Sequence, residues 1–281
     1  MSVQTPLDPT PAPVPAPVSG PLRRPKGALA VAIGTIVVGG CVILGTLVST
    51  GFTAARDLSA TSMGAPLQQS DVRGISDIDV NIAGGALRIA FDDVSEAEIG
   101  GGGVGAWRLE RRGDTLHVSS PRRSFTDWSS RGEATLTLPR SLKRQTLDLR
   151  VEVAGGSLDL TGDYGAVDVQ VTGGDATVSG GASALSLTVA GGSVTADVQG
   201  AEEAAFEVAG GDLTADLTGA APARTSVEVT AGSADIGLPN ETYRLTSDGP
   251  GSVDNNLQTS PKATPRVEVQ ATLGSVTLRT T

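Results

Sequence analysis

Five segments of the chain share one pattern: an apolar residue, a small residue, Gly-Gly, and then alternating polar and apolar residues. They read IAGGALRI (82–89), VAGGSLDL (153–160), VTGGDATV (171–178), VAGGSVTA (189–196) and VAGGDLTA (208–215). Degenerate copies follow at 229–236, 248–255 and 271–278, and from residue 156 onward the second glycines are 18 to 23 residues apart. A repeat of this length predicts a stack of similar structural units.

The residues between the Gly-Gly pairs alternate apolar and polar, as in Val167 to Val171 and Leu185 to Val189. This period of two is typical of a strand with one buried face, and the glycines suit sharp bends between strands. A unit of about 20 residues cannot bury its apolar face alone, so successive units are expected to stack. We therefore predict an all-β fold, a single-stack β-solenoid (β-helix) with Gly-Gly rungs of about 18–21 residues. Whether its C-terminal strand, Ser275 to Leu278, is an open edge stays undecided at this stage.

One stretch upstream of the repeats has the properties of a membrane span. Ala28 to Val48 holds 21 residues without a charge, which matches a hydrocarbon core of about 30 Å when helical. Arg23, Arg24 and Lys26 precede it, whereas the far side begins with Ser49, Thr50 and a neutral Arg56/Asp57 pair, so the N-terminus is predicted to face the cytoplasm. The predicted organisation is a disordered Pro-rich cytoplasmic tail (1–26), a single transmembrane α-helix (27–50), a linker (51–70) and an extracytoplasmic β-solenoid domain (71–281).

Two other interpretations of this region remain open. A signal peptidase could cleave after the small residues Thr53 to Ala55, or Cys41 could be lipidated, because Val38 to Cys41 is similar to a bacterial lipobox. Small residues four apart, such as Ala30 and Gly34, would also let two spans approach closely. A homo-oligomer formed through the span is therefore compatible with the sequence.

Charge restricts the range of partners. From Glu152 onward the chain has 17 acidic residues and only five basic ones. An acidic surface repels nucleic acid, so nucleic-acid binding is not expected.

Few residues could carry out catalysis or bind a metal. His117 is the only histidine, and no G-x-S-x-G motif accompanies it. Asp159, Asp235 and Asp254 share one repeat position, and stacked carboxylates could attract Ca²⁺, but serine and threonine interrupt the rows. We predict no catalytic residue, no cofactor and no metal, and regard an enzyme acting on glycans as the third choice, after a binding module and an accessory regulator of signalling.

One irregular stretch, 107–131, concentrates aromatic and arginine side chains in an otherwise aromatic-poor domain. Tryptophan and arginine dominate interface hot spots, so this stretch is the candidate contact with a partner. In the alternative interpretation, the tryptophans cover the apolar end of the stack. The candidate residues are Trp107, Arg108, Arg111, Arg112, Arg122, Arg123, Phe125, Trp128 and Arg131.

The Gly-Gly rungs behind one membrane span resemble the bacterial "putative adhesin" family of unknown function, whose domains are toast-rack-like β-solenoids. The resemblance covers roughly residues 70–281 and implies a fold without implying an activity. It suggests a binding module in the cell membrane of a bacterial envelope that contacts an envelope protein or glycan. The alternative it suggests is an accessory regulator of an envelope-stress signalling system.

Overall fold

A computed structural model of the chain describes residues 68–101, 107–120 and 132–281. The predicted tail and transmembrane helix, and nearly all of the predicted linker, lie outside these residues. No helix in the three described segments has the length and apolarity that crossing a membrane requires.

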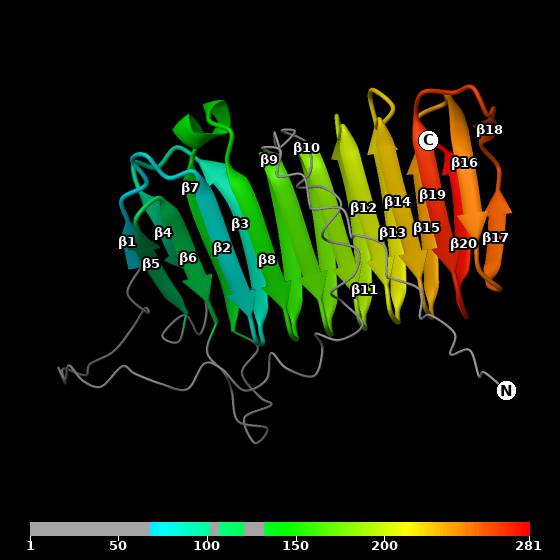
Figure 1. Ribbon diagram of the computed structural model, residues 1–281. Coiled ribbons are helices and arrows are strands. Elements are labelled where there is room, and N and C mark those ends of the chain that lie inside the picture. The colour runs from blue at the N-terminus through cyan, green and yellow to red at the C-terminus, as the bar shows by residue number, and fades with distance from the viewer. Residues whose placement is uncertain (1–67, 102–106, 121–131) are drawn as a thin grey trace, which may run out of the picture. The chain divides into compact units, whose positions relative to one another are not determined.

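The described residues form an all-β structure, as predicted, in which the strands lie side by side in one long row (Figure 1). They belong to two ladders. Most strands of the first ladder enter a Gly-Gly turn or one of its degenerate copies, and most strands of the second ladder leave one. We call one entering strand, its turn and the following strand a rung.

Within each ladder most neighbouring strands are parallel and share one register. The first ladder runs β5 (Arg108–Arg112), β6 (Thr115–Ser119), β2 (Asp77–Ile82), β8 (Asp148–Val153), the second part of β9 (Ser157–Val171), the second part of β10 (Asp175–Val189), β12 (Glu203–Val208), β14 (Arg224–Val229), β19 (Arg266–Ala271) and β16 (Thr242–Asp248).

The second ladder follows the same order on the other side of the turns. It runs β1 (Gln68–Ser70), β4 (Ala97–Gly100), β7 (Glu133–Pro139), β3 (Ala86–Asp92), the first parts of β9 and β10, β11 (Ser193–Gln199), β13 (Asp212–Thr218), β15 (Ser233–Leu238), β20 (Ser275–Thr280) and β17 (Ser252–Asn255). The 3₁₀ helix η2 (Arg140–Arg144) links β7 to β8, and the short β18 (Gln258–Thr259) follows β17.

Alternate residues of the two ladders point inward and form a single apolar core. Val169, Leu187 and Phe206, for example, are neighbours in consecutive rungs and are all buried. Alanines such as Ala176 and Ala196 are buried in the second ladder. The period of two in the sequence therefore corresponds to one buried and one exposed face, as predicted.

The Gly-Gly turns lie one above another and continue the hydrogen bonding between rungs. The N–H of Ser193 donates to the carbonyl of Gly174 at 3.0 Å, and the N–H of Asp212 donates to that of Gly192 at 3.0 Å. Gly192 has a φ of +91°, and a Cβ added to it would collide with the carbonyl oxygen of Gly174. Both the backbone conformation and the close approach require glycine at this position.

The expectation that repeats stack in sequence order is wrong at both ends. The β2–β3 rung lies between the β6–β7 and β8–β9 rungs, although β6 and β7 come later in the chain. At the other end β19 and β20 insert between the β14–β15 rung and the β16–β17 rung. The C-terminal strand is therefore paired on both sides and is not an open edge.

Candidate functional site

The N-terminal end of the stack is closed by the side chain of Gln68. Its Nε2 donates to the carbonyl of Trp107 at 2.6 Å, and its Oε1 accepts from the N–H of Leu109 at 3.0 Å. These bonds tie β1, at the end of the second ladder, to β5, at the end of the first. Trp107 is only 2% exposed and belongs to the core. Its position matches the alternative in which a tryptophan covers the apolar end of the stack.

Three candidate arginines lie on β5, the outermost strand of the first ladder. Arg111 donates through Nε to the carbonyl of Gly113 at 2.8 Å, and its Nη1 lies 3.8 Å from the Asp71 carboxylate. Arg112 pairs with Glu110 at 2.8 Å, across an exposed surface. Arg108 is exposed and forms no ion pair with the described acidic residues. The strand thus presents arginines to solvent.

The remaining candidates lie outside the described residues: Arg122, Arg123, Phe125, Trp128 and Arg131. The structure therefore places four of the nine candidates, one in the core and three on the end strand. The proposed contact of the other five with a partner stays a prediction.

His117 lies on β6 with its imidazole on the outer face. Its Nδ1 is 3.4 Å from a carboxylate oxygen of Asp79, and the antiparallel register places Glu110 opposite. This arrangement is a polar surface pair next to a second carboxylate. It brings no hydroxyl nucleophile into contact with the imidazole within the described segments.

The row of Asp159, Asp235 and Asp254 is interrupted by threonine, since Asp159 pairs with Thr177 and Thr277 lies between Asp235 and Asp254. A second row contains Asp175 and Asp212. The register aligns Asp175 with Ser157 and Ser193, and Asp212 with Ser193 and Ser233. Hydroxyls therefore separate the carboxylates. In the part of the chain that the structure describes, no three His, Cys, Asp or Glu side chains gather closely enough to hold a metal ion.

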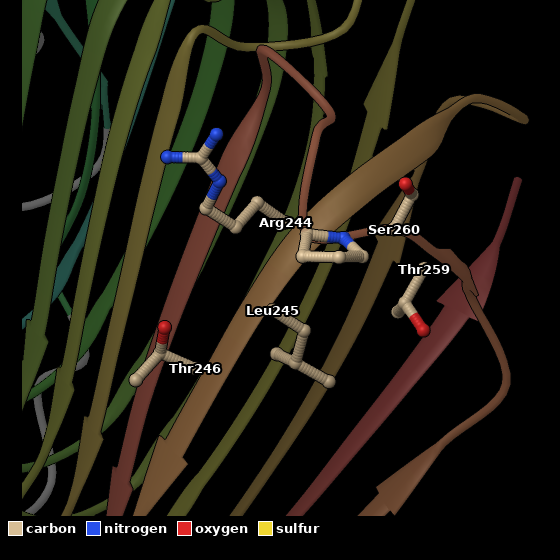
Figure 2. A pocket seen from close by; sticks show the side chains of 6 residues that line it. Arg244, Leu245, Thr246, Thr259 and Ser260 are labelled. Atoms are coloured by element: carbon tan, nitrogen blue, oxygen red, sulfur yellow. The ribbon is translucent and has the colours of Figure 1, made fainter.

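A shallow hollow of about 380 Å³ lies at the C-terminal end of the stack, where β16 meets the segment after β18 (Figure 2). It is lined by Arg244, Leu245, Thr246, Thr259, Ser260 and Pro261. In the close view Arg244 and Thr246 project to one side of β16 and Leu245 to the other. The sequence analysis did not single out this site.

A signal for this end was nevertheless present in the sequence. Arg224, Arg244 and Arg266 lie eight, seven and eight residues before the second glycines 232, 251 and 274 of their repeats. The equal offsets of Arg224 and Arg266 predict that these two arginines form a row on the outer face, whereas Arg244 lies one residue closer to its glycine and is added to the row only by the register. The register confirms the row, because Arg266 pairs with Arg224 on one side and with Arg244 on the other.

Burial raises the pKa of two tyrosine hydroxyls in the core. Tyr243, which donates to the carbonyl of Pro239 at 2.8 Å, has its pKa raised to about 12 by burial and by the nearby charge of Glu241. Tyr164 has its pKa raised by burial and by Asp163. Both hydroxyls remain protonated at neutral pH, so neither serves as a base.

The sequence of this chain matches one known protein family. The model of the family described as "putative auto-transporter adhesin, head GIN domain" matches residues 69–236, which run from β1 into β15. No curated protein sequence matches the chain. The last two rungs in the chain, from residue 237 onward, lie beyond the family match.

Two solved structures are similar at low identity. A putative cell adhesion protein from Clostridium sporogenes is 14% identical, with a TM-score of 0.33, and the match covers 77% of this chain and 98% of that one. A putative adhesin from Bacteroides fragilis is also 14% identical, with a TM-score of 0.33. That match covers 77% of this chain and 96% of the adhesin chain. Since the family model matches more than half of the sequence, the chain belongs to the family of "putative auto-transporter adhesin, head GIN domain" proteins.

Proposed function

We propose that this protein is a membrane-anchored, extracytoplasmic adhesin-like binding module that performs no catalysis. Membership of the adhesin head-domain family is the observation that carries the proposal. The outer rows of the described strands support it, because they are made of short polar and charged side chains at fixed spacing. Such a surface suits recognition better than chemistry.

The architecture proposed for residues 71–281 is a rigid β-solenoid. Its support is the shared parallel register from β8 to β15 and the single core beneath both ladders. In a stack of this kind each rung is held by its two neighbours. Contact residues on the surface are then held in place before a partner arrives, which lowers the entropic cost of binding.

The membrane anchor is proposed from sequence alone. The uncharged run from Ala28 to Val48 is long enough to span, and Arg23, Arg24 and Lys26 favour a cytoplasmic N-terminus. The module would then be displayed outside the cell membrane, where an envelope protein or glycan could be its partner. We propose the arginines of the 107–131 stretch as the first contact surface.

The test uses the full-length protein in its own membrane. Arg108, Arg112, Arg122, Arg123 and Arg131 are changed to Gln while Trp107 is kept, because removing a buried tryptophan would damage the fold. Partners are captured by proximity cross-linking in intact cells, and protease added outside the cells reports the topology. The control changes Arg73, Arg88, Arg140, Arg150 and Arg224 to Gln, which removes the same number of charges, since these are exposed arginines in ion pairs elsewhere on the stack.

We expect external protease to remove the C-terminal domain from intact cells, and we expect partners to be lost in the first variant and kept in the control. A domain protected from external protease would overturn the proposed topology. An unchanged partner set in the first variant would remove the 107–131 stretch as the contact surface.

A further inference from the structure

The outer edge of β16 at the C-terminal end of the stack is only partly covered. The N–H of Arg244 donates inward to the carbonyl of Pro265 at 2.8 Å, and β16 continues along β19 from there. On the outer side the N–H of Ser260 donates to the carbonyl of Tyr243 at 2.8 Å, where β18 begins a further strand. That strand is only two residues long, because the chain turns away at Pro261.

The backbone beyond this point is unpaired on its outer side. Successive residues of a strand direct their N–H and C=O groups to opposite sides. Since Arg244 bonds inward, Leu245 and Ser247 face outward, and neither has a backbone partner among the described residues. They present two donors and two acceptors, which is a template for an added strand.

The row Arg224, Arg266 and Arg244, which we call the arginine row, runs across the same end of the first ladder. Neighbouring strands are about 4.8 Å apart, and like charges directly opposite one another destabilise a sheet. Within the described residues only Arg224 has an acidic partner, Glu268 at 2.6 Å. The Nε of Arg244 is buried and has no hydrogen-bond partner there.

This concentration of positive charge is exceptional in its setting. The chain has only five basic residues after Glu152, and four of them are the arginine row and Lys262, which lies in the turn between β18 and β19. Acidic side chains lie along the whole stack, including Glu268 on β19 and Asp248 at the end of β16, but Arg244 and Arg266 have no acidic partner among the described residues. An anionic partner would neutralise the row and relieve its internal repulsion.

We propose that the outer edge of β16 binds an extended acidic segment of a partner protein, which adds as a strand where β18 stops. This proposal deepens the binding function proposed above by naming a second contact surface and the class of partner. Leu245 and Ser247 would pair with the backbone of the segment. Its carboxylates would lie beside the arginine row, and an apolar side chain would enter the hollow over Leu245.

Two other occupants fit the site less well. A glycan with carboxylates could satisfy the arginines but has no use for the unpaired backbone groups of Leu245 and Ser247. A second copy of the chain, paired edge to edge, would bring two arginine rows together. The unpaired backbone of β16 and the positive charge of the neighbouring arginine row therefore favour an acidic peptide strand as the occupant.

The probe is a fluorescein-labelled peptide, Glu-Val-Glu-Val-Thr-Val, measured by fluorescence anisotropy against the full-length protein in detergent micelles. Ser247→Pro removes the outward N–H without removing a bond to β19. The pair Arg244→Gln and Arg266→Gln removes charge and leaves the edge intact. Arg140→Gln with Arg150→Gln is the control of equal charge, and the thermal midpoint of each variant confirms folding.

We expect the peptide to bind the natural protein and the control, and to bind about tenfold or more weakly to both test variants, since charge-assisted and backbone hydrogen bonds both contribute. The same peptide with N-methylated backbone amides should fail to bind, a result that does not depend on how well the Ser247→Pro variant folds. Equal binding of the N-methylated peptide, or of the Lys-Val-Lys-Val-Thr-Val peptide, would overturn the proposal.

Two further readouts distinguish the other occupants. Polygalacturonate that binds through the arginines, and binds equally to Ser247→Pro, would make this a glycan site and overturn the peptide assignment. Self-association that disappears in Ser247→Pro, measured by sedimentation, would make a second copy the occupant. If no peptide binds while cells retain the partners captured through the 107–131 stretch, the binding function stands and this edge is not part of it.

Discussion

At the scale of single residues, the second glycine of each turn meets two separate demands. Gly192 has a positive φ, and its Cα also faces the carbonyl of Gly174 in the neighbouring rung. Gly200 has a positive φ of +80° but has no heavy atom within 4 Å of an added Cβ. A substitution at Gly200 therefore causes backbone strain alone, whereas a substitution at Gly192 causes backbone strain and a steric collision.

We predict that Gly192→Ala costs about 3 kcal/mol or more of unfolding free energy, because strain at positive φ and overpacking add. Gly200→Ala should cost only about 1 kcal/mol, from strain alone. Urea denaturation followed by circular dichroism measures both. Equal losses for the two variants would show that the contact between stacked turns contributes nothing.

A second residue-scale prediction concerns two glutamates in neighbouring rungs. Glu207 on β12 lies beside Glu228 on β14, and burial together with the charge of Glu228 raises the pKa of the Glu207 carboxyl. A carboxyl with a raised pKa in the folded state holds its proton more tightly there than in the unfolded chain. Its contribution to stability is therefore favourable in acid and is lost as the pH rises through its folded pKa.

Glu207→Gln should accordingly stabilise the protein at pH 7, by about 0.2–1 kcal/mol for a partly exposed like-charge pair. The gain should vanish below about pH 4, where the carboxyl is protonated in both states. Thermal unfolding at several pH values checks this, with Glu202→Gln on an exposed turn as the control. A gain that persists unchanged in acid would exclude the charge as its cause.

At the scale of elements, the two ends of the stack are closed differently. Antiparallel strands close the N-terminal end, with Trp107 beneath them and Gln68 bridging β1 and β5. At the C-terminal end β18 covers only the start of β16, and Leu257 is buried there. At the first end Gln68 occupies part of the outer edge of β5, and at the second end the outer edge of β16 is unpaired beyond β18 among the described residues.

We predict that Trp107→Ala lowers the unfolding free energy by about 3–5 kcal/mol, as for other buried aromatic residues. Arg108→Ala, next to it on the exposed face, should change stability by less than about 0.5 kcal/mol. Chemical denaturation of both variants is the measurement. A Trp107→Ala protein of natural stability would show that the tryptophan is not part of the core.

The sequence could place Trp107 in an unusual stretch but could not decide whether it was exposed. Its neighbours Arg108 and Arg111 point to solvent, and residue types alone fit both a contact surface and a cap. Its burial depends on segments distant in the chain, and Gln68, which bonds to the Trp107 carbonyl, is 39 residues away. The pairing of Arg224 with Arg266 could have been predicted, because both lie eight residues before the second glycine of their repeats, but the place of Arg244 in the row could not.

At the scale of the whole molecule, the order of the rungs in the stack differs from their order in the chain near both ends. The C-terminal rung, β19 and β20, is enclosed by the β14–β15 rung on one side and the β16–β17 rung on the other. Removing it would expose two edges in each ladder, those of β14 and β16 in the first and those of β15 and β17 in the second. Removing everything after Leu238 would expose only one edge in each ladder.

We therefore predict that a chain ending at residue 259 is less stable than a shorter chain ending at residue 238. The longer one keeps β16 and β17 but deprives them of their neighbours, while the shorter one ends on the intact β14–β15 rung. Thermal midpoints and size-exclusion profiles of the two truncated proteins test this. A higher midpoint for the chain ending at residue 259 would contradict the observed order of rungs.

The sequence by itself determined the all-β class, the positions of the turns and the buried face of each strand. These features are local: a period of two and a glycine with positive φ depend only on a few adjacent residues. The tertiary structure alone decided which rung lies next to which, that Trp107 is buried, and that an unpaired edge lies beside the arginine row. The physical reason is that every rung offers a similar apolar face and similar backbone edges, so the local pattern cannot specify a neighbour that is distant in the chain.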